Sequence, residues 1–555
     1  MDFKKQIETI LKRETKLKEI PLEIPNNPDF GDYAFPCFIL SKKLRKSPID
    51  IAKDLQKIKI PKSIEKVEAR GPYLNFFINK SIFIEGTIKK ILKEKDNYGK
   101  SKPSKEIILI ESPGPNTNKP LHLGHLRNMV LGISISKIQE AAGKKAINVD
   151  IINDRGIHIA KSALAYKKFG KNKKPNKKSD HFVGDYYILY SKKLKQHPEL
   201  ENEAQEMIRK YEAGDKQTIN LFNKMNKWAI NGFKETYNRV GINIKKTYLE
   251  SEHYKKGKSI VLKGLKDKTF KKDKEGNITI NLEKYDLGEK ILLRKDGTSV
   301  YITQDIYLAQ KRYKDFRFDK MIYIVGSEQI HHFKVLFTIL EILGYKFAKK
   351  CYHLPYGMVY LPEGRMKSRE GKVIDTDNLL DDIKELAKKE IIKRNKVSKT
   401  ELEKRSKQIA QAAVKFFLLN RDSLKDFTFN PEESIKFEGN TGPYIQYTHA
   451  RACSILRKAK TFKPAYRFNH EEQQIIKQLS ELPDIIKQSA QNYKTHIITN
   501  YLLAISKKFN EYYQKYPVLN AESKIRNSRL TLVKAMIQTI KNGLSLLGIE
   551  SPSKM

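Results

Sequence analysis

The sequence predicts a multidomain α/β protein, in which a Rossmann-like domain with a parallel sheet and an insertion follows an α+β module and precedes an all-α bundle. Its 555 residues are several times the usual length of one domain. Short apolar runs alternate with helical periodicity from about Lys105 to Tyr360, and almost only helical periodicity follows Thr376. These observations indicate three domains.

Residues 1–100 are expected to form the α+β module. Phe3, Ile7 and Leu11 recur at helical spacing near its start. At its end, the segment VEARGPYLNFFIN continues in a strand-like alternation after a Gly-Pro turn. A helix and strands with these apolar residues are enough for a core of their own.

Residues 101–375 are expected to form the Rossmann-like domain. The run KEIILIE, which begins at Lys105, is short and apolar, as buried parallel strands are. A Pro/Gly/Asn loop leads from it into a long helix that closes at Gly143, and the next run, AINVDII, is again strand-like. Strand, loop, helix and strand in this order are typical of a doubly wound sheet.

From about residue 161 to 290 the sequence becomes helical and lysine-rich, which we interpret as an insertion. The segment KILLRKDGTSVYIT then carries an Asp-Gly hairpin signal. Strand-helix order resumes with MIYIV, HHFKVLFTILEILG and CYHLPYGMVYL. One nucleotide-binding sheet interrupted by one insertion explains this order.

Residues 376–555 are expected to form the helical bundle. Helical periodicity extends over 376–422, 444–460, 471–515 and 524–547. No internal repeat or long low-complexity tract is present in the sequence.

The charge of the chain points to a polyanionic partner. Lysine and arginine number 108 and aspartate and glutamate 64, so the net charge is +44. A hydrophobic content of 39% excludes a wholly disordered basic tail. Cys37, Cys351 and Cys453 are too few for a disulfide framework and too scattered for a zinc ribbon, so we expect no structural zinc.

The N-terminal segment lacks the apolar stretch of a signal peptide and contains several acidic residues. No run approaches the roughly 18 apolar residues of a membrane span. We therefore expect a cytoplasmic protein without a membrane partner.

The segment NTNKPLHLGHLRN, residues 116–128, lies where the loop after the first strand enters its helix. His122 and His125 are three residues apart and share a face, and Gly124 leaves room for a flat ring. Imidazoles at a helix N-terminus can donate to phosphate oxygens, which suits a triphosphate. Two alternatives stay open: a solvated turn, and a histidine metal pair whose third ligand the sequence does not reveal.

A second basic segment, PEGRMKSREGKV at residues 362–373, follows the strand-like CYHLPYGMVYL. Its residues Arg365, Lys367 and Arg369 can wrap a polyphosphate from the side opposite the histidines and neutralise charge as phosphate leaves. Such a loop alone is more often a solvated surface. Its pairing with the histidine segment favours phosphate binding.

These two segments resemble the HIGH and KMSKS signatures of class I aminoacyl-tRNA synthetases, written here as HLGH and RMKSR. Further segments are similar to the arginyl-tRNA synthetase family: ESPGPNTNKPLHLGHLRNMVLG, NDRGIH, VYITQDIYLAQKRY, GSEQIHHFKVL, FEGNTGPYIQYTHARACSI, and FGDYAFP with GPYLNFF. The resemblance extends from near residue 20 to the C-terminus. This ordered set is far more specific than either signature alone.

The resemblance implies an arginine–tRNA ligase with a class I catalytic domain and an anticodon-binding bundle. Such an enzyme uses ATP with Mg²⁺ to form arginyl-adenylate from L-arginine. It then transfers the arginyl group to the 3′-terminal adenosine of tRNA(Arg), releasing AMP and pyrophosphate. We expect it to act as a monomer and to require tRNA for the first step too.

The resemblance also implies roles for individual residues. ATP would be held by Lys119, His122, Gly124, His125, Met366, Lys367, Ser368 and Arg369, of which Lys119, His122, His125 and Lys367 would be catalytic. L-arginine would be held by Glu111, Asn116, Tyr301, Asp305 and Gln329. The tRNA elbow would meet Tyr73 and Asn75, and the anticodon loop would meet Tyr444, Tyr447, Arg451 and Met555.

The chemistry of arginine supports part of this assignment. A guanidinium has five donors in a planar fork and a permanent charge, so its pocket needs acceptors such as Asp305 and Gln329. By pattern alone, Tyr301 and Asp305 also fit a core aromatic followed by a helix-capping acid. The spacing of the bundle's tyrosines also fits a buried helix face, and Tyr73 and Asn75 also fit a plain edge strand.

One departure concerns the KMSKS signature. Where its second lysine touches phosphate this chain has Ser368, and the nearest lysine, Lys367, is one position earlier. Family members that lack that lysine carry one just before the HIGH segment, as this chain does at Lys119. We therefore predict that Lys119 neutralises phosphate charge in its place.

Two alternatives of different kinds stay open. One is a catalytically inactive RNA-binding protein derived from a synthetase, which the joint presence of both histidines, Gly124 and the pocket residues argues against. The other is another class I synthetase such as the cysteinyl type. That type normally has a zinc site in its pocket, and the three scattered cysteines argue against it.

Overall fold

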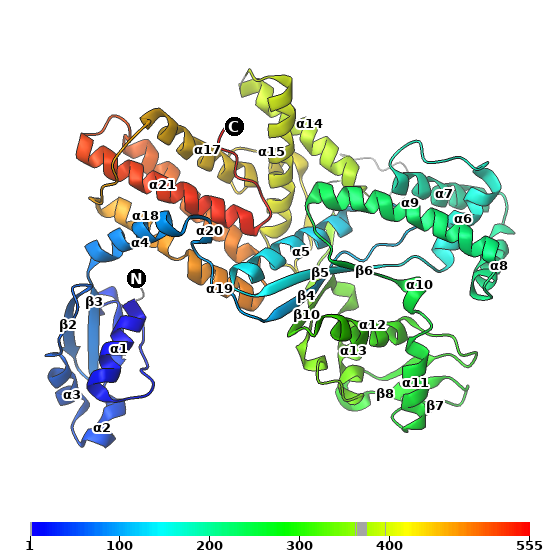
Figure 1. Ribbon diagram of the computed structural model, residues 1–555, viewed down its shortest axis with the longest axis horizontal. Coiled ribbons are helices and arrows are strands. Elements are labelled where there is room, and N and C mark those ends of the chain that lie inside the picture. The colour runs from blue at the N-terminus through cyan, green and yellow to red at the C-terminus, as the bar shows by residue number, and fades with distance from the viewer. Residues whose placement is uncertain (1–2, 361, 363–373, 395) are drawn as a thin grey trace. The chain divides into compact units, whose positions relative to one another are not determined.

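The computed structural model describes residues 3–360, 362, 374–394 and 396–555, shown as ribbons in Figure 1. The chain forms two compact units. One contains Met1–Tyr98, Ala452–Leu482 and Lys507–Thr539, and the other contains Gly99–Arg451, Pro483–Ser506 and Ile540–Met555. The helices expected as one C-terminal bundle are therefore divided between the two units.

The first unit opens with an antiparallel sheet in the order β1–β3–β2, formed by β1 (Tyr33–Pro36), β2 (Ile64–Arg70) and β3 (Tyr73–Ile78). Helices α1 (Phe3–Thr15), α2 (Phe38–Leu44) and α3 (Pro48–Leu55) accompany the sheet. Ile7 and Leu11 of α1 share a buried core with the sheet residues Leu74 and Phe76. The predicted Gly-Pro turn is confirmed between β2 and β3, where Gly71 has a φ of 57°.

The second unit is built on a parallel sheet in the order β11–β10–β4–β5–β6, whose middle strands are labelled in Figure 1. Its strands are β4 (Ile107–Glu111), β5 (Lys145–Ile152), β6 (Lys246–Leu249), β10 (Lys320–Gly326) and β11 (Cys351–Tyr356). Strand β4 lies between β10 and β5 in the sheet, and these two neighbours come from different halves of the chain. This arrangement confirms the predicted Rossmann-like fold.

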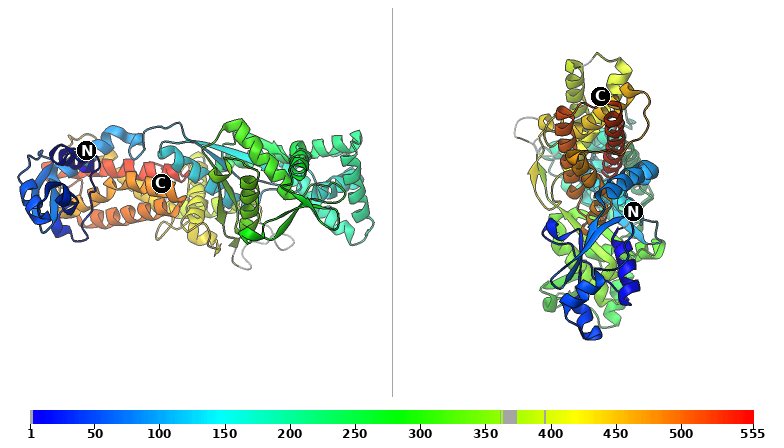
Figure 2. Two further views of the ribbon diagram at one scale, coloured as in Figure 1. Left: turned by 90° about the horizontal axis from the view of Figure 1, so that it is seen from below. Right: turned by 90° about the vertical axis from the view of Figure 1, so that its left-hand side faces the viewer.

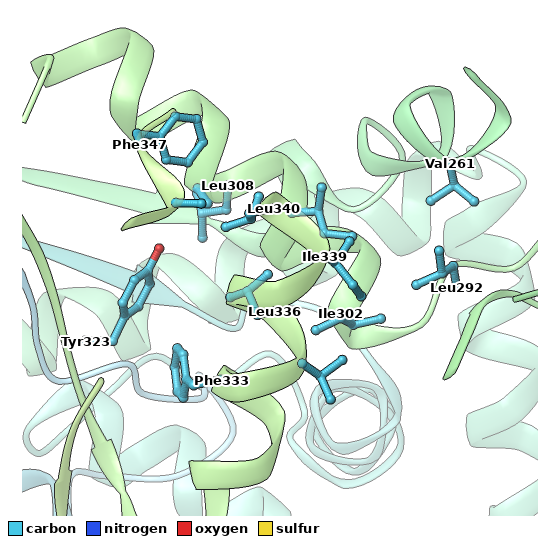
Figure 3. Packing of buried hydrophobic residues seen from close by; sticks show 14 of the residues in the cluster. Val261, Leu292, Ile302, Leu308, Tyr323, Phe333, Leu336, Ile339, Leu340 and Phe347 are labelled. Atoms are coloured by element: carbon cyan, nitrogen blue, oxygen red, sulfur yellow. The ribbon is translucent and has the colours of Figure 1, made fainter. Parts of the chain in front are cut away.

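Helices connect these strands as a doubly wound sheet requires. Helix α5 (Leu123–Ala141) lies between β4 and β5 in the chain, and α13 (Ile330–Ile342) lies between β10 and β11. Helix α12 (Tyr301–Phe316) precedes β10. Figure 3 shows the core that these elements share, in which Tyr323 of β10, Leu336 of α13 and Leu308 of α12 are buried.

The insertion between β5 and β6 is helical, as predicted, with α6 (Ile157–Phe169), α7 (Ser179–Leu194), α8 (Leu200–Glu212) and α9 (Lys216–Val240) grouped together in Figure 2. The stretch 161–290 is not helical throughout. It contains β6 of the central sheet, short helices α10 (Glu250–His253) and α11 (Gly257–Lys266), and an antiparallel sheet of β7 (Lys271–Lys272), β8 (Ile278–Asn281) and β9 (Glu289–Leu293). The Asp-Gly turn is confirmed after β9, where the Arg294 N–H donates to the Thr298 carbonyl over 3.0 Å.

The remainder of the chain is helical, as predicted, with more breaks than the periodicity shows. Its long helices are α14 (Thr376–Arg394), α15 (Lys399–Leu419), α17 (Gly442–Ala459), α18 (His470–Ser480), α19 (Leu482–Asn492), α20 (His496–Lys515) and α21 (Ser523–Leu546). Pro483 near the start of α19 and the positive φ of Tyr493 divide the expected helix over 471–515. Every described helix is too short or too polar to span a bilayer.

Candidate active site

The predicted site residues gather at the carboxyl edge of the parallel sheet. Glu111 ends β4, Asn116 lies in the loop that follows, and Gln329 lies just after β10. Asn116 forms a β-bridge with Asn153, which directly follows β5. The carboxyl edge beside the strand where the sheet order reverses is where doubly wound folds bind ligands.

The two histidines of the HLGH segment form a reciprocal cap at the start of α5. His122 is the N-cap residue, and the Gly124 N–H donates to its Nδ1 over 3.2 Å. The His122 N–H in turn donates to Nδ1 of His125 over 3.2 Å. Because each Nδ1 accepts a backbone hydrogen bond, each ring carries its proton on Nε2.

Both rings are therefore neutral donors at neutral pH. Burial, with help from the nearby Lys119, lowers the pKa of His122 to about 4. Burial also lowers the pKa of His125 far below its usual range, and the charges of His122 and Lys119 add to this. The ring centroids are 3.8 Å apart, so the pair offers two Nε2–H groups side by side. Such a pair suits phosphate oxygens.

Gly124 is needed for this geometry. A Cβ at this position would lie 3.0 Å from Cε1 of His122 and 3.1 Å from its Nδ1. Both separations are tighter than ordinary van der Waals contact, so any side chain would displace the ring. The glycine lets the His122 ring fold back over the first turn of α5.

Lys119 is a half-buried cation directly before this cap. Burial lowers the pKa of its ammonium. Its charge also lowers the pKa of both histidines, which places it close to them. An anionic phosphate beside Lys119 would offset the cost of burying its charge.

The predicted residues Met366, Lys367, Ser368 and Arg369 lie outside the described residues. The chain that follows them returns directly to the HLGH segment. The Leu123 N–H donates to the Ile374 carbonyl over 2.9 Å, and the Thr376 N–H donates to the Leu121 carbonyl over 2.9 Å. Residues 374–376, which follow the basic segment in the sequence, thus pair antiparallel with the HLGH segment.

Arg127 of α5 forms hydrogen bonds with the chain that precedes the basic segment in the sequence. This fully buried guanidinium donates to the Ser423 carbonyl over 2.7 Å and also to the Gly357 carbonyl. Gly357 shortly precedes β12 (Val359–Tyr360), which pairs with β13 (Phe427–Thr428). Burial lowers the pKa of Arg127 to about 10, yet it remains charged at neutral pH.

Glu111 lies deeper than its predicted contact with the α-amino group suggests. Its carboxylate is buried and forms an ion pair with Arg312 of α12, a residue that the sequence analysis did not single out. Burial raises the pKa of Glu111, Arg312 opposes this, and the charge of Asp305 adds to it. Any contact with an amino acid must therefore share this carboxylate with Arg312.

The acceptors predicted for a guanidinium lie at the start of α12 and just after β10. Asp305 accepts a hydrogen bond from Nε2 of His332 over 2.6 Å. Tyr301 is 78% exposed, so its ring is open to a ligand and is not part of the core. His332 was not among the predicted site residues, although it lies three residues beyond Gln329, a spacing that could have indicated it.

A group of acidic residues beside the HLGH segment has the spacing of a metal site but holds a lysine. Asp180, His181 and Asp377 have ligand atoms within 4.8 Å of one another. The ammonium of Lys178 lies 2.7 Å from Asp180 and 3.1 Å from Asp377. The cation between these carboxylates is therefore a side chain.

The predicted tRNA contacts lie in both units. In the first unit, Tyr73 is half-buried and Asn75 is only 3% exposed, so a contact of RNA with Asn75 needs neighbouring side chains to move. In the second unit, the Arg451 guanidinium donates to the Tyr447 hydroxyl over 3.0 Å. Tyr447 and Met555 pack against one apolar cluster with Phe437, and Tyr444 is half-buried.

A Rossmann-like sheet with HLGH at the start of its first helix, together with a helical C-terminal region, defines a class I aminoacyl-tRNA synthetase. The family model "tRNA synthetases class I (R), catalytic domain" matches residues 87–431. "Arginyl tRNA synthetase N terminal domain" matches residues 1–78, and "DALR anticodon binding domain" matches residues 445–555. The chain belongs to the arginyl-tRNA synthetase family.

Individual relatives match the sequence of this chain over almost its whole length. The arginine–tRNA ligase of Treponema denticola is 44% identical over 96% of this chain and 94% of its own length. That of Borreliella burgdorferi is 43% identical over 98% of this chain and 96% of its own length. The solved Thermus thermophilus arginyl-tRNA synthetase superposes with a TM-score of 0.81 at 26% identity, covering 100% of this chain and 99% of that one. The resemblance seen in the sequence is confirmed, and the cysteinyl alternative is excluded.

Proposed function

We propose that this chain is an arginine–tRNA ligase that activates L-arginine with ATP and charges tRNA(Arg). One observation carries the proposal. At the carboxyl edge of the sheet, neutral histidine donors and a lysine lie at the start of α5, while the Asp305 carboxylate at the start of α12 is near enough to raise the pKa of Glu111. Hydrogen-bond donors for phosphate oxygens, together with an acceptor for a guanidinium group, suit the binding of ATP and arginine.

The reaction needs no nucleophile from the protein. The carboxylate of arginine is already an anion and attacks the α-phosphorus of ATP in line, forming arginyl-adenylate and releasing pyrophosphate. His122 and His125 would donate from Nε2 to phosphate oxygens, and Lys119 would offset the charge that develops on the leaving group. Arg369 and Lys367 would act from the basic segment. The ribose hydroxyl of the terminal adenosine of tRNA then attacks the arginyl carbonyl, and AMP leaves.

Mg²⁺ would accompany the phosphates of ATP. Since both histidines are neutral, Lys119 supplies one positive charge at the start of α5, and most of the triphosphate charge remains to be balanced. Magnesium bound mainly by phosphates and water needs few protein ligands. When bound, it supplies further charge neutralisation.

The central test is aminoacylation of total tRNA with labelled arginine. We expect charging that depends on ATP and on arginine alone among the twenty amino acids. Pyrophosphate exchange measured with and without tRNA tests the expected tRNA requirement of the first step. A pure, folded protein that charges no tRNA would be the inactive RNA-binding alternative.

We expect arginine binding to improve with rising pH through the titration of His332. The hydrogen bond to Asp305 raises the pKa of His332 above 6.5. Below that pKa the imidazolium competes with the guanidinium for Asp305, and above it the competition is lost. The KM for arginine should fall about three- to fivefold between roughly pH 6 and 8.5. In His332→Gln this fall should be absent, and a fall that persists there would contradict the explanation.

We expect removal of Met555 to weaken tRNA binding. Met555 and Tyr447 pack against the same apolar cluster, so its loss would free the Tyr447 ring that Arg451 also contacts. The KM for tRNA should rise about fivefold, whereas the KM values for ATP and arginine stay unchanged. An unchanged KM for tRNA would remove Met555 and Tyr447 from the interface.

We also propose that the chain works as a monomer in the cytoplasm. Sedimentation equilibrium of the free protein and of its complex with tRNA tests the first part. We expect one protein chain for each tRNA.

A further inference from the structure

Helix α7 of the insertion packs on the segment that carries the two histidines. A Cβ added to Gly184 of α7 would lie 2.7 Å from Cδ of Pro120 and 3.7 Å from Cα of Lys119. The helix therefore approaches the backbone of the KPLHLGH segment as closely as a glycine permits. The insertion is in direct contact with the proposed phosphate site.

Residues at the start of α7 also form ion pairs with the chain that follows the basic segment. Lys178 bridges Asp180 and Asp377, over 2.7 and 3.1 Å. Nε2 of His181 lies 3.3 Å from the Asp375 carboxylate and 3.8 Å from that of Asp377. Two residues of the insertion thus face two residues that directly follow the basic segment.

The same short stretch pairs with the HLGH segment. The backbone of Asp375 forms a β-bridge with His122, while its side chain faces His181. Its carboxylate also accepts from the N–H groups of Asp377 and Asn378, each over 2.9 Å, and so caps α14. Asp375 is therefore fixed on one side by the insertion and on the other by the N-cap histidine.

The carboxylates in this cluster are paired with cations that come from the insertion. The carboxylates of Asp180, Asp375 and Asp377 face Lys178, His181 and Arg239. Arg239 lies 3.2 Å from Asp377 and also pairs with Asp381 over 2.6 Å. Burial alone would lower the pKa of His181, but the Asp377 and Asp375 carboxylates raise it. Asp180 is fully buried, so loss of Lys178 would leave a buried carboxylate beside Asp377 without its cation.

We propose that Lys178 and His181 are positioning residues for ATP binding, which act by holding Asp375 and Asp377 against the HLGH segment. This proposal rests on the proposed function of that segment as the phosphate site. It gives the insertion a role in the first step of the reaction. Without Lys178, repulsion between the carboxylates would shift the strand that pairs with His122, and the two Nε2–H donors would lose their alignment.

Lys178→Met tests the proposal through steady-state kinetics of aminoacylation. We expect the KM for ATP to rise about tenfold, with the KM for arginine and kcat at saturating ATP within about twofold of the original values. Lys178→Arg keeps the charge and should restore most of the loss. Lys177→Met is the matched control, because Lys177 is exposed and pairs with the exposed Asp185, so it should change nothing.

His181→Gln provides a second variant that leaves the Lys178 ion pairs intact, in case Lys178→Met does not fold. It should also raise the KM for ATP. Equal increases in the KM for ATP and for arginine, or a lower melting temperature with an unchanged KM for ATP, would overturn the proposal, since a merely structural role predicts these.

Calorimetric titration of the full chain with ATP, in the absence of arginine and tRNA, separates this proposal from the proposed function. If the original protein binds ATP but charges no tRNA, the proposed ligase function fails. The positioning role then depends on whether Lys178→Met weakens ATP binding about tenfold and Lys177→Met does not. If the two variants bind ATP equally, the positioning role fails.

Discussion

Lys119→Met is expected to lower the rate of arginine-dependent ATP–pyrophosphate exchange by about 10²-fold, mostly in kcat. Lys119 is a half-buried cation whose own pKa is lowered by burial. Its charge also lowers the pKa of both histidines. The histidines are neutral, so they can orient phosphate but cannot balance its charge. On the proposed assignment, Lys119 stabilises the leaving pyrophosphate, which gains charge as the bond breaks.

Two comparison variants make this result specific. Lys105→Met removes an exposed lysine of the same unit and should leave exchange unchanged. Lys367→Ala should have a smaller effect than Lys119→Met if Lys119 replaces the missing signature lysine. Near-normal exchange by Lys119→Met, together with a large loss in Lys367→Ala, would reverse the two roles.

The parallel sheet could be predicted because its strands are short apolar runs separated by a helix that closes at a glycine. This pattern holds for β4, α5 and β5. Strand β6 was not predicted because KTYL is only four residues long and lies between Lys245 and Glu250 within a largely helical, lysine-rich stretch. Periodicity is weakest for such short strands, and their pairing depends on contacts distant in sequence.

The grouping of the two histidines at the start of α5 could be predicted because these residues are local. His122, Gly124 and His125 are close in sequence, and a helix N-terminus specifies their geometry. The partners of the candidate site could not be predicted in the same way. Arg312 of α12 pairs with Glu111 at the end of β4, and His181 lies beside Asp375, which is far from it in the sequence, so only the folded structure brings these residues together.

Asp305→Asn is expected to have the largest effect of the substitutions considered, a fall of about 10²- to 10³-fold in kcat/KM for arginine. The amide keeps the size of the side chain but removes its charge and turns one acceptor into a donor that faces the guanidinium. The KM for ATP should stay unchanged, because the proposed phosphate site is on α5. Steady-state aminoacylation with each substrate varied in turn measures both effects.

The specificity of this result can be tested with citrulline, a neutral isostere of arginine. On the proposed assignment, Asp305 of the original protein matches the permanent charge of arginine, so citrulline should be a poor competitor. In Asp305→Asn the preference for arginine over citrulline should shrink, because the charge is no longer matched. Asp267→Asn alters an exposed carboxylate of the same unit and should preserve both values. If Asp305→Asn keeps its kcat/KM for arginine, the guanidinium is bound elsewhere along the carboxyl edge.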